Sequence, residues 1–392
     1  MDYIVPAKNG ESIQQTIDRA AKAGGGRVVL EPGIYPSGTI YMRDNIELHL
    51  NAGAVIFGRE GSDSYDDFSP AAIHGVAPEK SQKCIIAADS VKNISITGDG
   101  EINGNGLTFY DTNVPEGECF SKPPHPRPRM IQMVNCTNVR LDGISVMESP
   151  NWNIYLALCR DVKIRNIRVM GDHRFNNGDG IDMDSCTNVV ISDCIFNTSD
   201  DCLILRAIRH DLNVPSICEQ VTVTNCILNS RCNGIRIGCP SDDTIRNCSF
   251  NNIIFKGTGS GVHCEVPFRY LRKHCTGYLN VYNITFNNFN IDCGRYPIRI
   301  GIEDGLKLRG IDNLHFNNFV IKSNLPIYLK GNAKTPLTNI SLNDISGTVN
   351  SDDPLHLQFV RNLKMEKIDL TAEIGEDVPF KRIEWESWET KF

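Results

Sequence analysis

The chain lacks three features that each define a large class of proteins. No stretch of its 392 residues approaches the roughly 20 consecutive apolar residues with which a helix spans a membrane. The first residues contain no basic segment followed by an apolar run, so we expect no secretory signal and a cytoplasmic protein. The net charge of -7 shows no basic excess, which argues against nucleic acid as the main partner. We therefore expect a protein that acts on neither membranes nor nucleic acids.

Linkers and metal-binding cysteine pairs are also missing. No Pro/Gly/Ser-rich stretch divides the sequence, so we expect one domain over residues 1–392. The 15 cysteines are an odd number in a chain without a predicted signal, which favours free thiols over disulfides. None has the spacing of a zinc site, and several follow asparagine, as Cys136, Cys226 and Cys248 do. We interpret the cysteines as stacked interior residues and expect no metal and no cofactor.

The chain does contain a repeat that continues along most of its length. An asparagine precedes two apolar residues separated by one position, and a short polar turn and a second apolar strand follow. Examples begin at Asn93, Asn138 and Asn188, and successive units lie about 22 to 36 residues apart. Such a unit cannot bury its apolar face alone, so neighbouring units must stack. Asparagine at the bends fits this stacking, because its amide can bond the next coil and tolerates left-handed backbone geometry.

The repeat predicts an all-β fold, a single-stranded parallel β-helix. A β-propeller would instead need antiparallel four-stranded blades of about 40 to 50 residues with hairpin signals, which the sequence lacks. Before the first repeat, residues 11–23 place Ile13, Ile17, Ala20 and Ala21 on one helical face. We expect this short helix to cap the open end of the β-helix, where an exposed edge would otherwise pair with other strands.

Asp179 and the adjacent pair Asp200-Asp201 lie about one repeat apart in the middle of the sequence. Stacked coils would project them from neighbouring turns. This arrangement suits acid/base hydrolysis of a glycosidic bond, because crowding of like charges raises the pKa of one carboxyl group and keeps it protonated. A solvated acidic turn is the structural alternative.

Five segments, in their order along the chain, resemble glycoside hydrolase family 28, the polygalacturonase family of right-handed parallel β-helices. They are GGGRVVLEPGIYPSGTIYM, GDGEINGNG, SPNWNI, NGDGID and SDDCLILR, and the resemblance extends over nearly the whole chain. It implies a right-handed β-helix in which Asp179, Asp200 and Asp201 are catalytic. Family members invert the anomeric centre, with carboxyl groups typically about 6.5 to 9.5 Å apart. The resemblance assigns Asp200 as the acid, while Asp179 and Asp201 hold the attacking water.

Two segments depart from the family pattern. Cys232-Asn233-Gly234 stands where the family has Gly-His-Gly, whose histidine supports the acid. His263 and Glu265 stand where the family has the arginine and lysine of Arg-Ile-Lys, which hold the carboxylate of the substrate. Because a cation is the natural partner of a uronic acid, we do not expect ordinary polygalacturonan as the substrate. A neutral or deoxy sugar at the cleaved position is the expectation instead.

Several residues are candidates for substrate binding. Asn233 could bond sugar hydroxyls. His263 and Glu265 would point the same way from a strand, and Glu265 is also a candidate acid or base. Four further candidates are Arg206, Arg236, Trp152 and His173. The alternative for the two arginines is a surface ion pair, and the alternative for the tryptophan is packing in the core. The role of the histidine is ambiguous.

Weaker candidates lie elsewhere in the chain. We interpret Asp182 as a turn or ladder residue. Glu303 and Asp304 fall on a later coil, on what could be the same side of the cleft. The proline-rich segment 111–129 interrupts the rhythm of the repeats, as a functional loop often does. If it closes one end of the cleft, the enzyme acts from chain ends, and three of its side chains could meet substrate: His125, Arg127 and Arg129.

The sequence therefore predicts an inverting glycoside hydrolase that acts from the ends of pectin-derived or related oligosaccharides. A cytoplasmic location would favour such small imported substrates over a polymer. Two other classes stay open. A polysaccharide lyase on the same fold would bind calcium through its carboxylates and use a lysine or arginine as base. A non-catalytic β-helix would bind the glycan without cleaving it.

Overall fold

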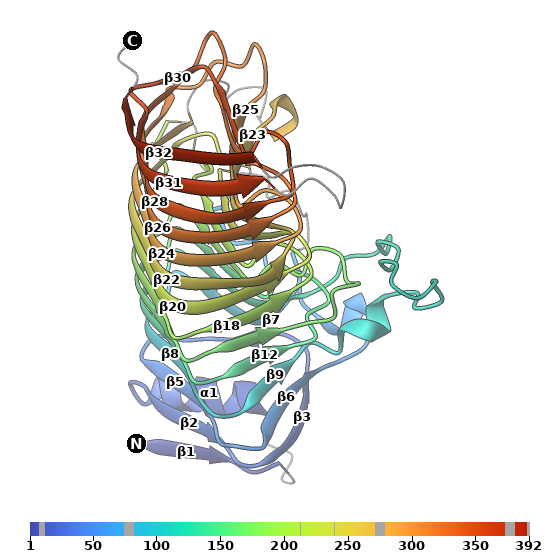
Figure 1. Ribbon diagram of the computed structural model, residues 1–392. Coiled ribbons are helices and arrows are strands. Elements are labelled where there is room, and N and C mark those ends of the chain that lie inside the picture. Colours follow the sequence, from blue (N-terminus) through green and yellow to red (C-terminus); the bar gives the residue numbers. More distant parts are fainter. Residues whose placement is uncertain are drawn as a thin grey trace. The chain divides into compact units, whose positions relative to one another are not determined.

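The computed structural model describes residues 1–7, 12–73, 82–211, 213–238, 240–270, 279–372 and 381–389. The protein is a right-handed parallel β-helix with one short helix near its N-terminus, which confirms the predicted fold class (Figure 1). Two compact units divide the chain, Met1–Asp200 and Asp201–Phe392, and each is described by itself. No helix in the described part of the chain is long and apolar enough to cross a membrane.

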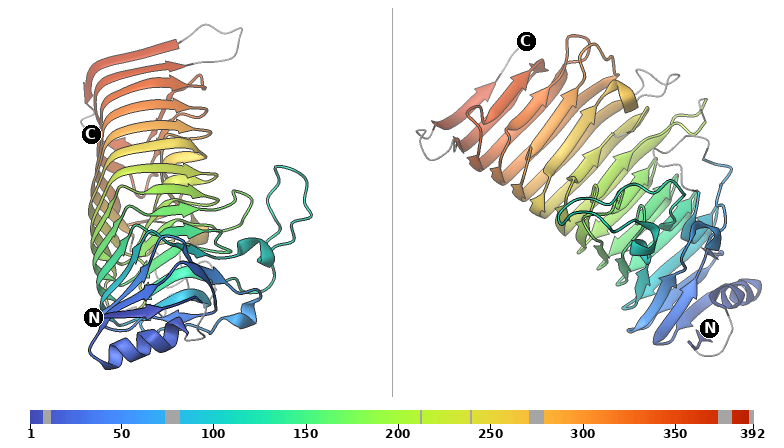
Figure 2. Two further views of the ribbon diagram at one scale, coloured as in Figure 1. Left: turned by 90° about the horizontal axis from the view of Figure 1, so that it is seen from below. Right: turned by 90° about the vertical axis from the view of Figure 1, so that its right-hand side faces the viewer.

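Helix α1 (Ile13–Lys22) confirms the predicted helix and packs against the first strands of the first unit (Figure 2). Ser12 begins it with a capping box, because its hydroxyl accepts from the Gln15 amide while the Gln15 side chain accepts from the Ser12 amide. Ile13, Ile17 and Ala20 are buried as their spacing predicts, whereas Ala21 is half-buried. Glu11, the first residue of the predicted helix, lies outside the described residues.

Three series of parallel strands form the first unit, and within each series every strand pairs with the equivalent strand of the next coil. The first series is β1 (Asp2–Val5), β2 (Gly26–Leu30), β5 (Ile46–Leu50), β8 (Lys92–Gly98), β11 (Thr137–Asp142), β14 (Arg160–Arg165) and β17 (Thr187–Ser192). The second is β3 (Gly33–Ser37), β6 (Ala54–Gly58), β9 (Glu101–Asn103), β12 (Ser145–Met147), β15 (Arg168–Met170) and β18 (Ile195–Thr198). The third is β4 (Ile40–Tyr41), β7 (Cys84–Asp89), β10 (Arg129–Val134), β13 (Ile154–Ala157) and β16 (Ile181–Asp184).

Two series form most of the second unit. The long strands are β20 (Ile217–Ser230), β22 (Thr244–Thr258), β24 (Asn280–Cys293), β26 (Gly310–Ser323), β28 (Leu337–Val349) and β31 (Lys364–Ala372). The short strands are β19 (Leu203–Arg206), β21 (Asn233–Ile237), β23 (Ser260–Val266), β25 (Ile298–Ile302), β27 (Ile327–Lys330) and β29 (Leu355–Gln358). Strand β30 (Val360–Arg361) pairs with β28, and the last strand, β32 (Lys381–Glu389), runs antiparallel to β31.

Asparagines at the bends form the hydrogen-bonded ladder that the repeat predicts. Asn283 and Asn313 adopt left-handed backbone geometry with φ of 56° and 54°. The Asn283 side-chain amide donates to Asn247 at 3.1 Å, and the Asn313 amide donates to Asn283 at 2.7 Å. Each bend is therefore bonded to the equivalent bend of the neighbouring coil.

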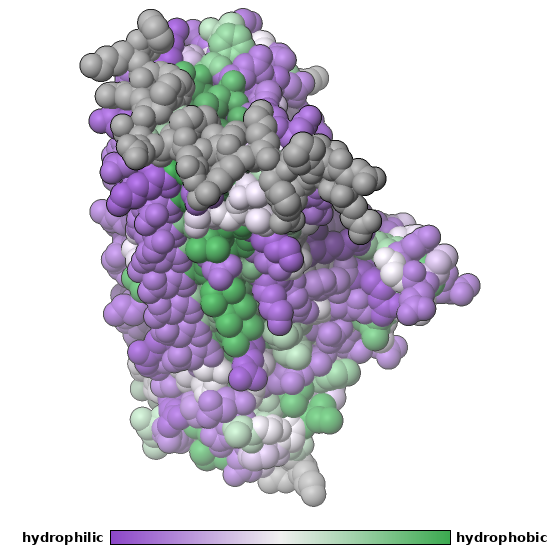
Figure 3. All heavy atoms as spheres, viewed as in Figure 1, coloured by the Kyte–Doolittle hydropathy of each residue, from purple (hydrophilic) through white to green (hydrophobic). Residues whose placement is uncertain are grey.

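Stacked aromatic rings fill the interior of the second unit. The ring centroids of Phe250 and Phe286 lie 5.3 Å apart, and those of Phe286 and Phe316 lie 4.8 Å apart. The described cysteines are free thiols, mostly buried, in agreement with their interpretation as packing residues. On the face shown in Figure 3, apolar atoms gather over β20 and β22, where Ile227 and Ile254 are exposed neighbours in register.

Candidate active site

Asp179 and Asp200 belong to the first unit, on segments that a hydrogen bond joins. The Gly178 amide donates to the Ser199 hydroxyl at 3.0 Å, so the residues just before the two aspartates touch. A Cβ atom on Gly178 would lie 2.4 Å from that hydroxyl oxygen, which is why a glycine precedes Asp179. Asp179 is 4% exposed, and its backbone oxygen accepts from the Asn153 side chain at 2.9 Å. The two segments that carry the aspartates are therefore joined next to them.

Asp182 and Asp184 are fully buried in β16. Asp182 thus lies in a strand rather than a turn, next to Tyr155 in register, which agrees with the ladder alternative. Asp184 accepts a hydrogen bond from the Tyr155 hydroxyl at 3.1 Å. Sequence analysis missed Asp184 and Tyr155, although the alternation of Ile181-Asp-Met-Asp is a strand pattern that could have identified the first of them.

Trp152 packs in the core of the first unit. Its side chain is 1% exposed and clusters with Phe68 and Tyr155. The guanidinium carbon of Arg129 lies 4.3 Å from the centroid of the tryptophan ring and 4.8 Å from that of Tyr155. Of the two roles considered for Trp152, the structure therefore agrees with core packing, because buried neighbours cover the ring.

Arg127 anchors the 111–129 segment instead of reaching outward. Its guanidinium donates to the backbone oxygens of Pro150 at 2.8 Å and Asn176 at 2.6 Å, and it also contacts the Tyr110 hydroxyl. The side chain is 3% exposed. The segment is therefore anchored beside the residues that precede Asp179, while part of its loop projects from the coils (Figure 1).

Two histidines of the first unit differ in their surroundings. His173 is half-buried, and its Nε2 atom is hydrogen-bonded to the Asn197 side chain at 2.9 Å, in β18. His125 is exposed, with its ring 6.4 Å from that of Phe109. Substrate contacts of both residues stay predictions.

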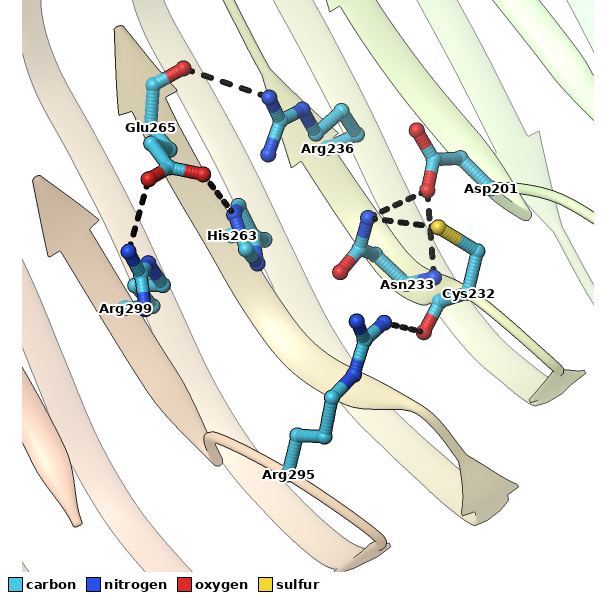
Figure 4. A network of polar contacts seen from close by, with 8 residues as sticks. All are labelled: Asp201, Cys232, Asn233, Arg236, His263, Glu265, Arg295 and Arg299. Carbon is cyan, nitrogen blue, oxygen red and sulfur yellow. Dashed lines mark hydrogen bonds and ion pairs between the residues drawn. The ribbon is translucent and has the colours of Figure 1, made fainter. Parts of the chain in front are cut away.

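Asp201 opens the second unit, and Asn233 holds it in place (Figure 4). One carboxylate oxygen, Oδ1, accepts from the Asn233 backbone amide at 3.1 Å and from its side-chain amide at 2.6 Å. The two residues are 8% and 4% exposed. A Cβ atom on the next residue, Gly234, would lie 2.3 Å from the Phe255 ring, so glycine lets this strand approach. Asn233, predicted as a sugar ligand, therefore has its amide nitrogen engaged with Asp201.

Arg206 and Arg236 are buried in the second unit, at 3% and 4% exposure. The alternative of a surface ion pair is thus wrong for both, because neither lies at the surface. Arg206 ends β19, whereas Arg236 lies in β21 and donates to the backbone oxygen of Glu265 at 3.3 Å. Their binding of substrate stays a prediction.

His263 and Glu265 point to the same side of β23, as their spacing predicts, and interact with each other. The Nε2 atom of His263 lies 3.4 Å from Oε2 of Glu265. The other carboxylate oxygen, Oε1, accepts from Arg299 at 2.7 Å. Arg299 lies on β25, and no sequence motif indicated its part in this cluster.

The cluster fixes the charges of its members. Burial lowers the pKa of His263 to about 4, against the opposing effects of Glu265 and Asp201. The hydrogen bond from His263 lowers the pKa of Glu265 to about 2, and Arg299 acts in the same direction. At neutral pH the imidazole is therefore uncharged and the carboxylate ionised.

Glu303 and Asp304 are exposed and engaged in local contacts. Glu303 accepts from the Phe268 backbone amide at 2.8 Å, and Asp304 forms an ion pair with Lys330 at 3.1 Å. A substrate contact of either residue stays a prediction.

The low pKa of His263 is expected to make the protein less stable in mildly acidic solution, because there the histidine is protonated only in the unfolded chain. Its pKa falls from 6.5 in the unfolded chain to about 4 in the folded protein, so unfolding takes up a proton between these values. The contribution of His263 to the free energy of unfolding is fully present above pH 6.5. It declines as the pH falls, by about 2 kcal/mol at pH 5. Urea denaturation at pH 7 and pH 5 measures the loss, and His263→Asn should remove most of it. An equal decline in the variant would assign the effect to other groups.

Comparison with known proteins agrees with this architecture. The profile of Glycosyl hydrolases family 28 matches residues 67–303. A probable polygalacturonase of Arabidopsis thaliana is 29% identical over 65% of this chain and 54% of that protein. A probable endo-xylogalacturonan hydrolase of Neosartorya fischeri is 28% identical over 54% of this chain and 50% of that protein. The chain thus spans about half the length of these curated relatives.

A solved structure shares the fold over nearly all of the chain. The hyperthermoactive exopolygalacturonase from Thermotoga maritima superposes with a TM-score of 0.73 at 20% identity, and covers 99% of this chain and 95% of its own. Since the family profile spans more than half of the sequence, and the strands and motifs agree with it, the chain belongs to family 28 of the glycosyl hydrolases.

Proposed function

We propose that the protein is an inverting O-glycoside hydrolase in which Asp179, Asp200 and Asp201 act together. Asp200 protonates the leaving oxygen, and Asp179 and Asp201 orient the water that attacks the opposite face of the sugar. The observation that carries the proposal is the fixed carboxylate of Asp201, held through two hydrogen bonds by Asn233 in a family of glycosyl hydrolases. Such a fixed, largely buried carboxylate is suited to orienting water.

We further propose action from the ends of pectin-derived or related oligosaccharides other than polygalacturonan. The ionised Glu265 and the uncharged His263 support this, because neither attracts the carboxylate of a uronic acid. The names of the relatives above refer to galacturonans, so this chain would differ from them at the sugar. Anchoring of the 111–129 segment by Arg127 supports end-directed action, since a fixed insertion can close one end of a cleft.

A product analysis tests the proposed reaction. The purified protein is incubated with a panel of pectic and neutral oligosaccharides, and reducing ends and the anomeric protons of the first products are followed. We expect new reducing ends of inverted configuration, from neutral or mixed oligosaccharides more than from oligogalacturonides. Retained configuration would overturn the mechanism. Unsaturated products that absorb in the ultraviolet and vanish with chelator would establish a lyase, and binding without any cleavage would establish a glycan-binding protein.

A further inference from the structure

A row of polar and aromatic side chains crosses the short strands of the second unit. The register aligns Arg236 with His263, His263 with Arg299, Arg299 with Tyr328, and Tyr328 with His356. Residues in register on parallel strands point to the same face, about 4.8 Å apart. The row therefore continues from the surroundings of Asp201 along four further strands of the sheet.

Arg299 packs beside two neighbouring tyrosine rings, of which Tyr328 belongs to this row. Its guanidinium carbon lies 4.5 Å from the ring centroid of Tyr296 and 5.0 Å from that of Tyr328. On its other side, Tyr328 stacks on His356 with centroids 4.7 Å apart and ring planes 7° apart. A planar guanidinium packed on aromatic rings has little rotational freedom. Ring contacts therefore support the Arg299 side chain, which donates a hydrogen bond to Glu265.

Glu265 connects Arg299 to His263 through its two carboxylate oxygens. Arg299 holds Oε1 at 2.7 Å, which leaves Oε2 to face the Nε2 atom of His263 at 3.4 Å. A carboxylate only accepts hydrogen bonds, so it selects the tautomer that carries its proton on Nε2. The remaining ring nitrogen, Nδ1, then keeps its lone pair and is an acceptor.

Two buried acceptors result from this arrangement, on the paired strands β21 and β23. Nδ1 of His263 and Oδ1 of Asn233 are both buried and have no hydrogen-bond partner among the described residues. The side chains are 8% and 4% exposed. In Figure 4 the amide oxygen of Asn233 lies on the side that faces His263, while its amide nitrogen bonds Asp201. A buried acceptor left without a donor destabilises the protein, and a ligand hydroxyl would satisfy it.

We propose that Nδ1 of His263 and Oδ1 of Asn233 bind two hydroxyl groups of an uncharged sugar unit beside Asp201, and that Glu265 and Arg299 are positioning residues for this acceptor pair. The proposal rests on the proposed function, which makes Asp201 a reacting carboxylate. A sugar carboxylate at the same place would meet two lone pairs and the ionised Glu265, and would be repelled. The recognised class is therefore a neutral sugar, selected through its hydroxyl donors.

Two disaccharides that differ only at C6 test the proposal. α-1,4-Galactobiose and α-1,4-digalacturonate are titrated calorimetrically into the full-length Asp200→Asn protein, in which turnover is prevented and the acceptor pair is intact. We expect galactobiose to bind at least about tenfold more tightly. Equal or tighter binding of digalacturonate would assign the site to a carboxylate held by Arg236, and would overturn the proposal. Absence of measurable binding of both sugars would overturn it as well.

Matched variants distinguish an acceptor role of His263 from a role in packing alone. In the same background, His263→Gln moves the polar group away from the Nδ1 position and should weaken galactobiose binding about tenfold. His263→Asn places a carbonyl oxygen near that position and should restore most of the affinity. His315→Gln, on the long strand β26 and outside the row, is the control and should bind as the parent does. Equal losses in both His263 variants would contradict an acceptor role.

The tautomer of His263 can be measured directly, and a purely structural role of the residue would not require a particular tautomer. The charged groups that face His263 are Asp201, Arg236 and Glu265, with Arg299 behind Glu265. In ¹⁵N-histidine spectra at pH 7, we expect an unprotonated Nδ1 for His263, assigned by its loss in His263→Asn. Glu265→Gln should mix the tautomers and reduce the preference for galactobiose. A protonated Nδ1 in the parent would overturn the proposal.

The proposal and the proposed function fail in different ways. If wild-type protein binds galactobiose through His263 but releases no reducing ends from any oligosaccharide, the acceptor pair stands and the hydrolase does not. If it cleaves oligogalacturonides in preference to neutral sugars, the hydrolase stands and the acceptor pair does not.

Discussion

Replacement of Asp201 by asparagine is expected to lower kcat on a cleaved oligosaccharide by about 10² to 10⁴-fold, the usual contribution of a positioned acid or base. The asparagine oxygen can still accept the two hydrogen bonds from Asn233, so the local structure is retained. Only the charge that orients and activates water is lost. Steady-state kinetics on the best substrate of the panel measures the effect, together with the thermal midpoint as a test of folding.

The control for this variant is Asp292→Asn. Asp292 is an exposed aspartate of β24 in the same unit, next to Lys322 in register. The same chemical change there should leave kcat within about twofold, since surface substitutions have small effects. If Asp201→Asn kept kcat within tenfold of the wild type, Asp201 would not be a reacting carboxylate, and the mechanism would fall.

Truncation of Phe286 to alanine is expected to have the largest effect on stability. Its side chain is fully buried between Phe250 and Phe316, with centroid distances of 5.3 and 4.8 Å. The cavity has stacked rings on two sides, so the neighbouring coils cannot collapse into it without breaking their register. We expect a loss of about 3 to 5 kcal/mol in the free energy of unfolding, measured by urea denaturation.

Thr285→Ala is the matched control for Phe286→Ala. Thr285 precedes Phe286 on the same strand and points to the opposite face, between Ser249 and His315 in register. Its truncation should change the free energy of unfolding by about 0.5 kcal/mol or less. A loss below about 1 kcal/mol for Phe286→Ala would mean that the coils do relax around the cavity.

The coils could be predicted from the sequence because the features that form them involve residues close together in the chain. Alternation of apolar residues and asparagine at the bends depend on neighbouring positions, and the ladder from Asn247 to Asn313 follows from them. The short N-terminal helix was equally local, since Ile13, Ile17 and Ala20 lie on one face. For Trp152 the sequence left substrate binding and core packing both open, because a motif does not show which segment will cover a ring.

The part of the site that sequence analysis missed depends on register. Arg299 lies 34 residues after Glu265, and Tyr328 belongs to a further coil. The length of the loops between these strands decides which residues meet, and no periodic pattern encodes that length. Asn233 is a second example: the sequence identified it as a site residue, but its hydrogen bond to Asp201 could not be predicted without the register.

The asparagine ladder also has an evolutionary consequence. Each rung presents the same amide donor and acceptor to the coil on either side, as Asn283 does between Asn247 and Asn313. Duplication or loss of a whole repeat would therefore leave matching surfaces at the junction, and the chain could change length in steps of one coil. A single-residue insertion within a strand would instead turn every following side chain to the wrong face. Whole coils, rather than single residues, are the units in which such a protein can grow.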